Sequence, residues 1–183
     1  MKKWLVRVLA GTVGVLVLLV AVLALMGQRE DAGLSLASIE ISAPTEQVWR
    51  WIEEPDKFKQ WVGWVTSVEV LNSEVNGVGR KTVVLMNEPG SSELVRIESV
   101  STAYDPPRHF SADVALPGFF TGSQSYQLTD LGGGLTRVQL ESRIHYTMWM
   151  VRLLEPVATP SSTPKLEQDL VTLKSKIEEA GVR

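Results

Sequence analysis

Cysteine is absent from this chain of 183 residues, and histidine occurs only twice. The missing thiols exclude disulfide bonds, cysteine nucleophiles and thiolate metal sites. His109 and His145 lie in separate predicted strands, and neither has a second histidine at ligand spacing. A metal site would therefore have to be built from carboxylates alone. We expect neither a metal ion nor a cofactor.

Clusters of basic residues are also scarce. The net charge is −3, and Lys2, Lys3 and Arg7 precede the first hydrophobic run, where no acidic residue stands. The rest of the chain is therefore more acidic than the total indicates. Because nucleic-acid affinity depends on lysine and arginine gathered against phosphates, we expect no nucleic-acid partner. The sequence does not identify a protein partner.

Residues 8–26 form one long hydrophobic run without a charged side chain. A helix of about 20 apolar residues crosses a bilayer core of about 30 Å, so the run predicts a transmembrane anchor over residues 1–27. A cleaved signal peptide is one alternative, but Ala24-Leu25-Met26 fits its A-x-A-like cleavage pattern poorly. A buried helix of a globular domain is the other. The cations before the run predict a cytoplasmic N-terminus and a domain on the extracytoplasmic side.

After a short polar linker at residues 28–33, residues 34–183 are predicted to form one folded domain. Its central stretch is 39–71, where proline and hydrophobic spacing predict a strand, two short helices and a second strand. Four of the six tryptophans lie there, namely Trp49, Trp51, Trp61 and Trp64. A buried aromatic side chain covers about 150–250 Å². Each tryptophan therefore belongs either to the core or to the wall of a ligand cavity.

Alternating apolar and polar residues predict seven strands, and most are joined by short turns. Neighbouring strands should therefore pair antiparallel. The predicted strands are 34–41, 66–71, 80–86, 93–103, 109–116, 123–129 and 135–146. Residues 117–122 (PGFFTG) are predicted to be a loop that exposes Phe119 and Phe120. The glycines at 77–79 and 132–134 lead into strands, so they indicate hairpin turns rather than phosphate-binding loops.

The C-terminal segment is predicted to be helical, with one interruption. Pro156 and Pro160 are expected to break the helix, and Thr163-Pro164 provides a cap and a first-turn proline for a second helical piece. The leucines and isoleucine of that piece recur along one stripe, which should pack across the chain's own sheet. They are Leu166, Leu170, Leu173 and Ile177.

Several short stretches of the chain resemble the SRPBCC superfamily. They are Ile41-Ser42-Ala43-Pro44 with Val48-Trp49, residues 58–64, Tyr104-Asp105-Pro106-Pro107-Arg108, residues 132–138, and Leu173-Lys174. The resemblance covers about residues 34–181. It implies an α+β helix-grip fold of the START or Bet v 1 type. In that fold a seven-stranded curved antiparallel sheet wraps round a long C-terminal helix, and two short helices follow the first strand. Here the predicted transmembrane helix would precede it.

The resemblance also implies a cavity between the sheet and the C-terminal helix that holds an apolar or amphipathic small molecule. Small residues expected on the concave face would leave room for it. They are Thr82, Val84, Ser99, Ala112, Ser123 and Ser125. The candidate cavity-lining residues are Trp61, Trp64, Phe110, Phe119, Phe120, Tyr126, Tyr146, Leu166 and Leu170.

Three functions remain open at this point. The first is a membrane-anchored domain that binds a lipid, an isoprenoid or a polyketide-like molecule. The second is a cyclase or dehydrase-type enzyme that acts on such a ligand. Its candidate groups are His109, Asp113, Tyr126, Arg143 and Tyr146. No pair among them has the spacing of a nucleophile with its base, which favours binding over catalysis. The third is a non-catalytic membrane adaptor.

Overall fold

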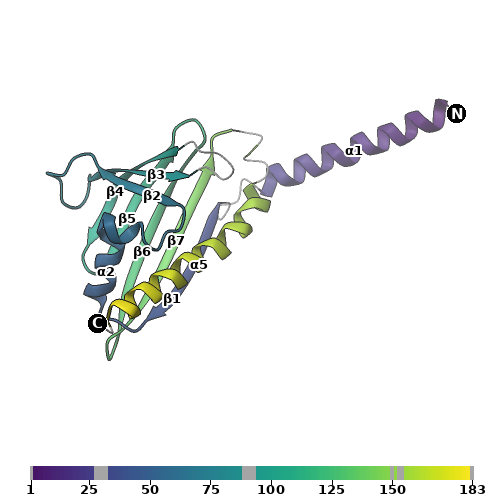
Figure 1. The fold of residues 1–183 in the computed structure, drawn as a ribbon. Coiled ribbons are helices and arrows are strands. Elements are labelled where there is room, and N and C mark those ends of the chain that lie inside the picture. Colours follow the sequence, from purple (N-terminus) through teal and green to yellow (C-terminus); the bar gives the residue numbers. More distant parts are fainter. Residues whose placement is uncertain (1, 27–32, 88–93, 149–150, 152–154, 182–183) are drawn as a thin grey trace.

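The computed structural model of the protein describes residues 2–26, 33–87, 94–148, 151 and 155–181 (Figure 1). The helices are α1 (Lys2–Met26), α2 (Thr45–Glu53), α3 (Pro55–Phe58) and α5 (Glu155–Gly181). The strands are β1 (Leu34–Ile41), β2 (Val65–Val70), β3 (Lys81–Asn87), β4 (Leu94–Asp105), β5 (His109–Leu116), β6 (Phe120–Gly132) and β7 (Leu135–Tyr146).

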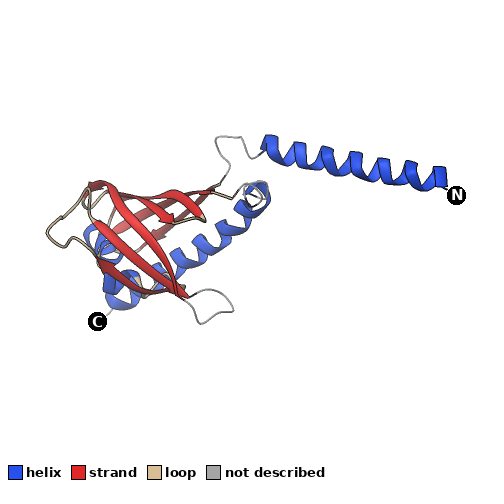
Figure 2. Ribbon diagram, turned by 90° about the horizontal axis from the view of Figure 1, so that it is seen from above, coloured by secondary structure: helices blue, strands red, loops and turns tan. Residues whose placement is uncertain are grey.

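The seven strands form one sheet in the order β1-β7-β6-β5-β4-β3-β2, and every neighbouring pair is antiparallel. The predicted seven-stranded antiparallel sheet is therefore confirmed. Only β1 reaches its partner by a long connection, because α2, α3 and five strands lie between β1 and β7 in the chain. Figures 1 and 2 show the sheet curving, with α2 and α5 on its concave side.

Helix α2 begins where the sequence indicates. The Pro44 carbonyl oxygen accepts hydrogen bonds from the amides of Gln47 and Val48, which closes the first turn. Its apolar side chains recur at helical spacing and are buried against the sheet. Pro55 is the first residue of α3, and the single residue Glu54 separates α3 from the end of α2. The second helix is shorter than expected, since its four residues end at Phe58.

Helix α5 lies along β1, the edge strand of the sheet, as Figure 1 shows. Leu170, Leu173 and Ile177 are fully buried and belong to the same core as Ile41 of β1 and Val138 of β7. The predicted apolar stripe therefore packs on the chain's own sheet. Burying each such side chain contributes about 1.5–3 kcal/mol, so this contact is a principal source of the domain's stability.

Two polar contacts hold the exposed side of α5 to the strand beneath it. The Lys174 ammonium donates to the Glu40 carbonyl oxygen over 2.6 Å, and the Ser42 amide donates to Glu178 Oε1 over 3.0 Å. The Ser42 amide, with Lys174 beside it, lowers the pKa of Glu178. A carboxylate that stays ionised to lower pH keeps the helix end attached over a wider acid range.

Among the described residues, no helix is both long enough and apolar enough to cross a membrane. The predicted transmembrane anchor is therefore wrong, and so is the single-pass topology with a cytoplasmic N-terminus. Helix α1 does form, but it starts at Lys2. The three cations expected to precede an apolar span thus lie within the helix itself. The predicted linker falls largely on residues 27–32, outside the described residues.

The predicted interruption of the C-terminal helix is also wrong. Residues 155–181 form one helix, although Pro160 and Pro164 lie inside it. Proline removes one backbone N–H and typically kinks a helix, but it does not oblige the chain to leave helical geometry. The predicted earlier piece falls mostly on residues 149, 150 and 152–154, which lie outside the described residues.

The loop predicted at residues 117–122 is shorter than expected. β5 ends at Leu116 and β6 begins at Phe120, so three residues make the turn. Gly118 adopts φ +79°, a left-handed conformation that glycine takes without strain. Phe120 and Gly122 therefore belong to the sheet rather than to a loop.

The α5 contact can be tested by truncating one leucine. Leu173→Ala should lower the free energy of unfolding by about 2–5 kcal/mol, because it opens a cavity in a fully buried site. The matched control is Val171→Ala on the same helix, where the valine is 58% exposed and a change below about 0.5 kcal/mol is expected. Chemical denaturation measures both, and equal effects would contradict the packing described here.

Candidate ligand-binding cavity

A cavity of about 470 Å³ lies between the concave face of the sheet, helices α2 and α3, and α5. This size falls within the range of about 300–1,000 Å³ that is typical of small-molecule sites. Its described lining is mainly apolar and comes from six strands and three helices. The lining includes Ile52, Phe58, Trp64, Val68, Val84, Met86, Ile97, Phe110, Ala112, Val114, Phe119, Phe120, Tyr126, Ile144, Tyr146 and Leu166.

The strand register arranges this lining in rows across the sheet. One row joins Val70, Thr82, Ser99, Val114, Gly122 and Ile144 through successive strand pairs. The next row joins Ser101, Ala112, Gln124 and Ser142. Both rows consist largely of small side chains, and Gly122 has none. Side chains in the middle of the concave face therefore project only a short distance from the sheet, while larger side chains lie on either side of them.

The position of α5 explains why this space is not filled. Its buried side chains cover β1 and β7, at one edge of the sheet, and among the α5 side chains that the structure describes, Lys165 and Leu166 border the cavity. The described leucines of α5 thus pack with residues of β1, β6 and β7, at one side of the sheet. Where no helix covers the sheet, only large side chains could fill the space to the usual packing density. The side chains of the central rows are small, so a hollow remains.

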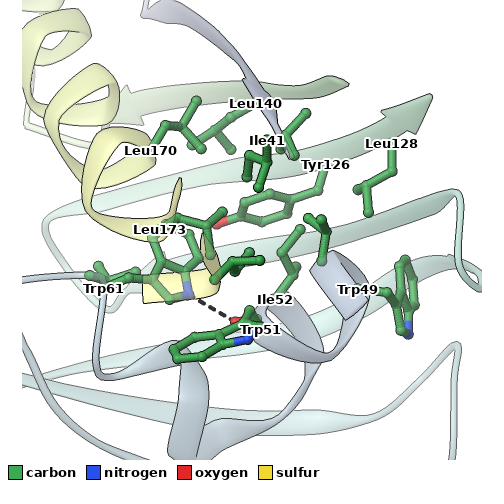
Figure 3. Close-up of a cluster of buried hydrophobic side chains, with 14 of the residues drawn as sticks. Ile41, Trp49, Trp51, Ile52, Trp61, Tyr126, Leu128, Leu140, Leu170 and Leu173 are labelled. Atoms are coloured by element: carbon green, nitrogen blue, oxygen red, sulfur yellow. Dashed lines mark hydrogen bonds between the residues drawn. The ribbon is translucent and has the colours of Figure 1, made fainter. Parts of the chain in front are cut away.

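Aromatic rings close the deep end of the cavity. The Tyr126 ring lies edge-on to Trp61, with centroids 6.4 Å apart, and 6.2 Å from the Phe110 ring. Figure 3 shows Tyr126 in the middle of side chains that converge from α2, β6 and α5. Trp61 is fixed behind it, because its indole Nε1–H donates to the Trp51 carbonyl oxygen over 2.8 Å.

A buried carboxylate stands close to this aromatic group. Asp169 is buried on α5, and its Oδ2 accepts a hydrogen bond from Trp64 Nε1 over 3.3 Å. Lys165 Nζ lies 3.5 Å from Asp169 Oδ1. Burial raises the pKa of the Tyr126 phenol far above its ordinary value, and the negative charge of Asp169 raises that pKa further. The Tyr126 phenol therefore stays neutral well above the pH of about 10 at which an exposed tyrosine ionises.

An ion pair occupies another part of the wall. Arg80 Nη1 donates to Glu53 Oε1 over 2.7 Å, and the two side chains are only 13% and 23% exposed. The Arg80 guanidinium also lies 6.0 Å from the centre of the Tyr104 ring. Arg80 Nε is buried and has no hydrogen-bond partner among the described residues. Arg80 thus borders the cavity as part of an ion pair, while its Nε is enclosed by the protein.

A second aromatic group lies at the opposite end of the strands. Phe119 packs edge-on against Tyr146 at 5.6 Å and against Phe120 at 6.4 Å. The backbone of Phe119 is held by hydrogen bonds to Leu116 and Thr147. Phe119 lines the cavity and is 42% exposed, so it reaches both the interior and the solvent. This end is the more open one.

Seven of the nine predicted lining residues border the cavity. They are Trp64, Phe110, Phe119, Phe120, Tyr126, Tyr146 and Leu166. Trp61 and Leu170 instead lie in the hydrophobic core, where each is 1% exposed. Trp49 and Trp51 are core residues as well. Trp64 is thus the tryptophan of the central stretch that borders the cavity.

The predicted small residues divide between the two faces of the sheet. Thr82, Val84, Ser99 and Ala112 line the cavity. The prediction is wrong for Ser123 and Ser125, because adjacent residues of a strand point to opposite faces and Gln124 and Tyr126 point inward. Ser125 instead forms an outer-face cluster in which its hydroxyl and that of Ser111 lie 3.1 and 2.9 Å from His109 Nε2.

The candidate catalytic groups divide in the same way. Tyr126 and Tyr146 border the cavity. Asp113 and Arg143 line a depression on the outer face of the sheet, together with His145. His109 also lies on the outer face, in register opposite Gln127. The sheet therefore separates the two tyrosines from the other three groups.

The sequence predicted Thr82 and Ser99 on the concave face, but it did not identify Gln124, Arg80, Glu53 or Asp169. Gln124 could have been assigned from the strand alternation that places Tyr126 inward, since the two are separated by one residue. Arg80 and Glu53 come from a hairpin turn and a helix end, 27 residues apart, and no spacing rule links them. Asp169 lies on the buried stripe of α5, where an acidic residue is unexpected.

The chain has the SRPBCC-type helix-grip fold, as solved structures of similar shape indicate. A protein from Thermus thermophilus aligns with a TM-score of 0.65 and 20% identity over 80% of this chain and 98% of that one. A START superfamily protein from Mycobacterium smegmatis aligns with a TM-score of 0.63 and 14% sequence identity, over 80% of this chain and 98% of that one. An aromatase/cyclase from a Streptomyces species aligns with a TM-score of 0.60 and 16% sequence identity, over 82% of this chain and 95% of that one.

The family assignment comes from the sequence itself. Residues 36–178 match the polyketide cyclase/dehydrase and lipid transport family, so the chain belongs to that family. The match covers the sheet from β1 onward and nearly all of α5. No curated protein is significantly similar to the chain.

The environment of Tyr126 predicts a loss of stability in alkali. The unfolded chain ionises this phenol near pH 10, whereas the raised pKa keeps it neutral in the folded state. The stability that results is therefore complete below about pH 10 and falls as the pH rises above it, by at most about 1.4 kcal/mol per pH unit. Denaturation at about pH 8 and about pH 11 should show a smaller loss for Tyr126→Phe than for the native chain. An identical loss would contradict the assigned burial.

Proposed function

We propose that this protein binds a hydrophobic or amphipathic small molecule, such as a lipid, an isoprenoid or a polyketide-like compound, in the cavity between the sheet and the helices. The observation that carries the proposal is the cavity itself, with its volume of about 470 Å³ and its mainly apolar lining. Apolar area removed from water contributes about 25 cal/mol per Å², so a ligand that fills the hollow gains affinity from burial alone.

Family membership supports the proposal without selecting a ligand. The family description combines cyclases and dehydrases with lipid transport, and one structural neighbour is described as an aromatase/cyclase. Both activities need an apolar molecule held in an enclosed site. Binding is therefore the part of the function that they have in common.

A cyclase-type enzyme is the second candidate, and Tyr126 is the observation that favours it. Tyr126 borders the cavity, and its phenol is protonated at neutral pH, as an ordinary tyrosine phenol with a pKa of about 10 also is. A neutral phenol is able to donate a hydrogen bond to a carbonyl oxygen of a bound molecule. Substrate turnover that falls in Tyr126→Phe while affinity is retained would support this candidate over simple binding.

A cavity-filling variant tests the binding proposal. Ser99→Phe places a benzyl group in the hollow, so the full-length protein should bind the neutral dye N-phenyl-1-naphthylamine at least tenfold more weakly, a change of about 1.4 kcal/mol. Val100→Phe is the matched control, because Val100 is the next residue of β4 and points to the outer face. Dye fluorescence measures affinity.

Two outcomes of this titration would count against the proposal. If the native chain fails to enhance dye fluorescence, the cavity does not take up apolar molecules. If Val100→Phe weakens binding as much as Ser99→Phe, the dye is held on the outer face instead. Thermal melting of each variant separates loss of binding from loss of fold.

The aromatic group at the open end provides a second test. Phe119→Ser/Phe120→Ser removes two rings that line the cavity, and binding of the same dye should weaken about tenfold as their apolar contact is lost. The partial exposure of Phe119 makes this group less important for the core, so the domain should remain folded. Unchanged affinity in a folded variant would remove both phenylalanines from the proposed site.

A further inference from the structure

The charged side chains around the cavity form two neutralised pairs. Arg80 is bonded to Glu53, and Lys165 lies within ion-pair distance of Asp169. Within the described part of the chain, Arg80, Glu53 and Lys165 are the charged residues that line the cavity, and Asp169 is buried beside Lys165. Each of these cations therefore already has an acidic partner, and the described charges at the cavity sum to zero when Asp169 is included.

Uncharged polar groups cross the floor of the cavity beside the Arg80–Glu53 pair. We call Thr82, Ser99, Gln124 and Ser142 the polar band. Thr82 and Ser99 are paired across β3 and β4, and Gln124 and Ser142 are paired across β6 and β7. The Ser101 amide, one row along, donates to the Arg80 carbonyl oxygen over 2.9 Å, so the ion pair adjoins the band.

These groups are suited to oxygen atoms that bear no charge. Hydroxyl and amide side chains both donate and accept hydrogen bonds. A purely apolar ligand would leave such groups unsatisfied, at a cost of about 1–3 kcal/mol for each buried donor or acceptor. A ligand with hydroxyl or carbonyl oxygens would satisfy them.

A carboxylate is a poor match for the same wall. Burying an ionised carboxylate is costly unless a cation compensates it. Here the charge of Arg80 is already offset by Glu53, whose own carboxylate would repel a second one at short range. Lys165 is similarly held by Asp169. An anionic ligand would therefore meet cations whose charge is already offset by an internal acid.

We infer that the ligand taken up under the proposed function is uncharged, with hydroxyl or carbonyl oxygens that contact the polar band, and that the Arg80–Glu53 pair discriminates against fatty acids and other carboxylates. This inference rests on the proposed function, since it specifies the chemical class that enters the same cavity. Glu53 is its specificity-determining residue, because its carboxylate removes the free positive charge that would otherwise attract an anion.

The test compares three probes of equal chain length on the full-length protein at a pH of about 8, where a carboxylic acid is ionised. The probes are 1-decanol, 2-decanone and decanoate, and displacement of N-phenyl-1-naphthylamine gives their affinities. Alcohols leave water more readily than carboxylates, so the ratio of affinities in the native chain is only the reference. The decisive quantity is the change in that ratio when Glu53 is replaced.

Glu53→Gln keeps the size of the side chain but leaves Arg80 without its counter-charge. Decanoate should then bind at least tenfold more tightly than it binds the native chain, whereas 1-decanol and 2-decanone should change less than about threefold. Glu40→Gln is the matched control. It removes an acid from an ion pair of the same 2.7 Å length, Glu40–Arg137, which is exposed and does not line the cavity. It should leave all three affinities unchanged.

A second variant protects the test against failure of Glu53→Gln to fold. Ser99→Lys adds an unpaired cation to the polar band and should produce the same gain for decanoate. If a folded variant of either kind leaves the decanoate-to-decanol ratio as it is in the native chain, the inference is wrong and the proposed function stands. If the native chain binds neither the dye nor any of the three probes, the proposed function itself fails.

Discussion

The contact between α5 and β1 is the constraint on which the rest of the domain depends. Leu170, Leu173 and Ile177 enter the core beside the edge strand, and Lys174 and Glu178 fix the same helix to the backbone at Glu40 and Ser42. A helix fastened at one edge of a curved seven-stranded sheet cannot also cover the opposite half. The space over the strands from β2 to β6 is therefore a consequence of where the helix is held.

The wall of the cavity has two kinds of chemistry in separate places. Aromatic rings close both ends, with Tyr126 and Phe110 at the deep end and Phe119 and Tyr146 at the open end. The polar band lies in the strand rows between these ends, and the Arg80–Glu53 pair lies near Tyr104, which is paired with Phe110 of the deep end. Under the proposed function, apolar contact would provide affinity along a ligand, while the polar groups would distinguish one ligand from another.

Strand alternation separates this interior from a second set of functional groups. His109, Ser111 and Ser125 form hydrogen bonds on the outer face, while Phe110 and Tyr126, their neighbours in sequence, line the cavity. Groups suited to acid–base chemistry are therefore neighbours of cavity-lining residues in the sequence, but they lie on the opposite face of the sheet. Among the described residues, this arrangement therefore supports ligand binding more directly than it supports catalysis inside the cavity.

The sequence by itself determined the elements, since apolar period, proline and glycine depend on local geometry. It determined the seven strands, the start of α2 close to Pro44 and the buried stripe of α5. Only the tertiary structure decided that 155–181 is one helix despite its prolines, that no described helix is suited to cross a membrane, and that Trp61 belongs to the core. It also decided that Arg80 meets Glu53, because strand register and helix placement bring together residues that no local rule connects.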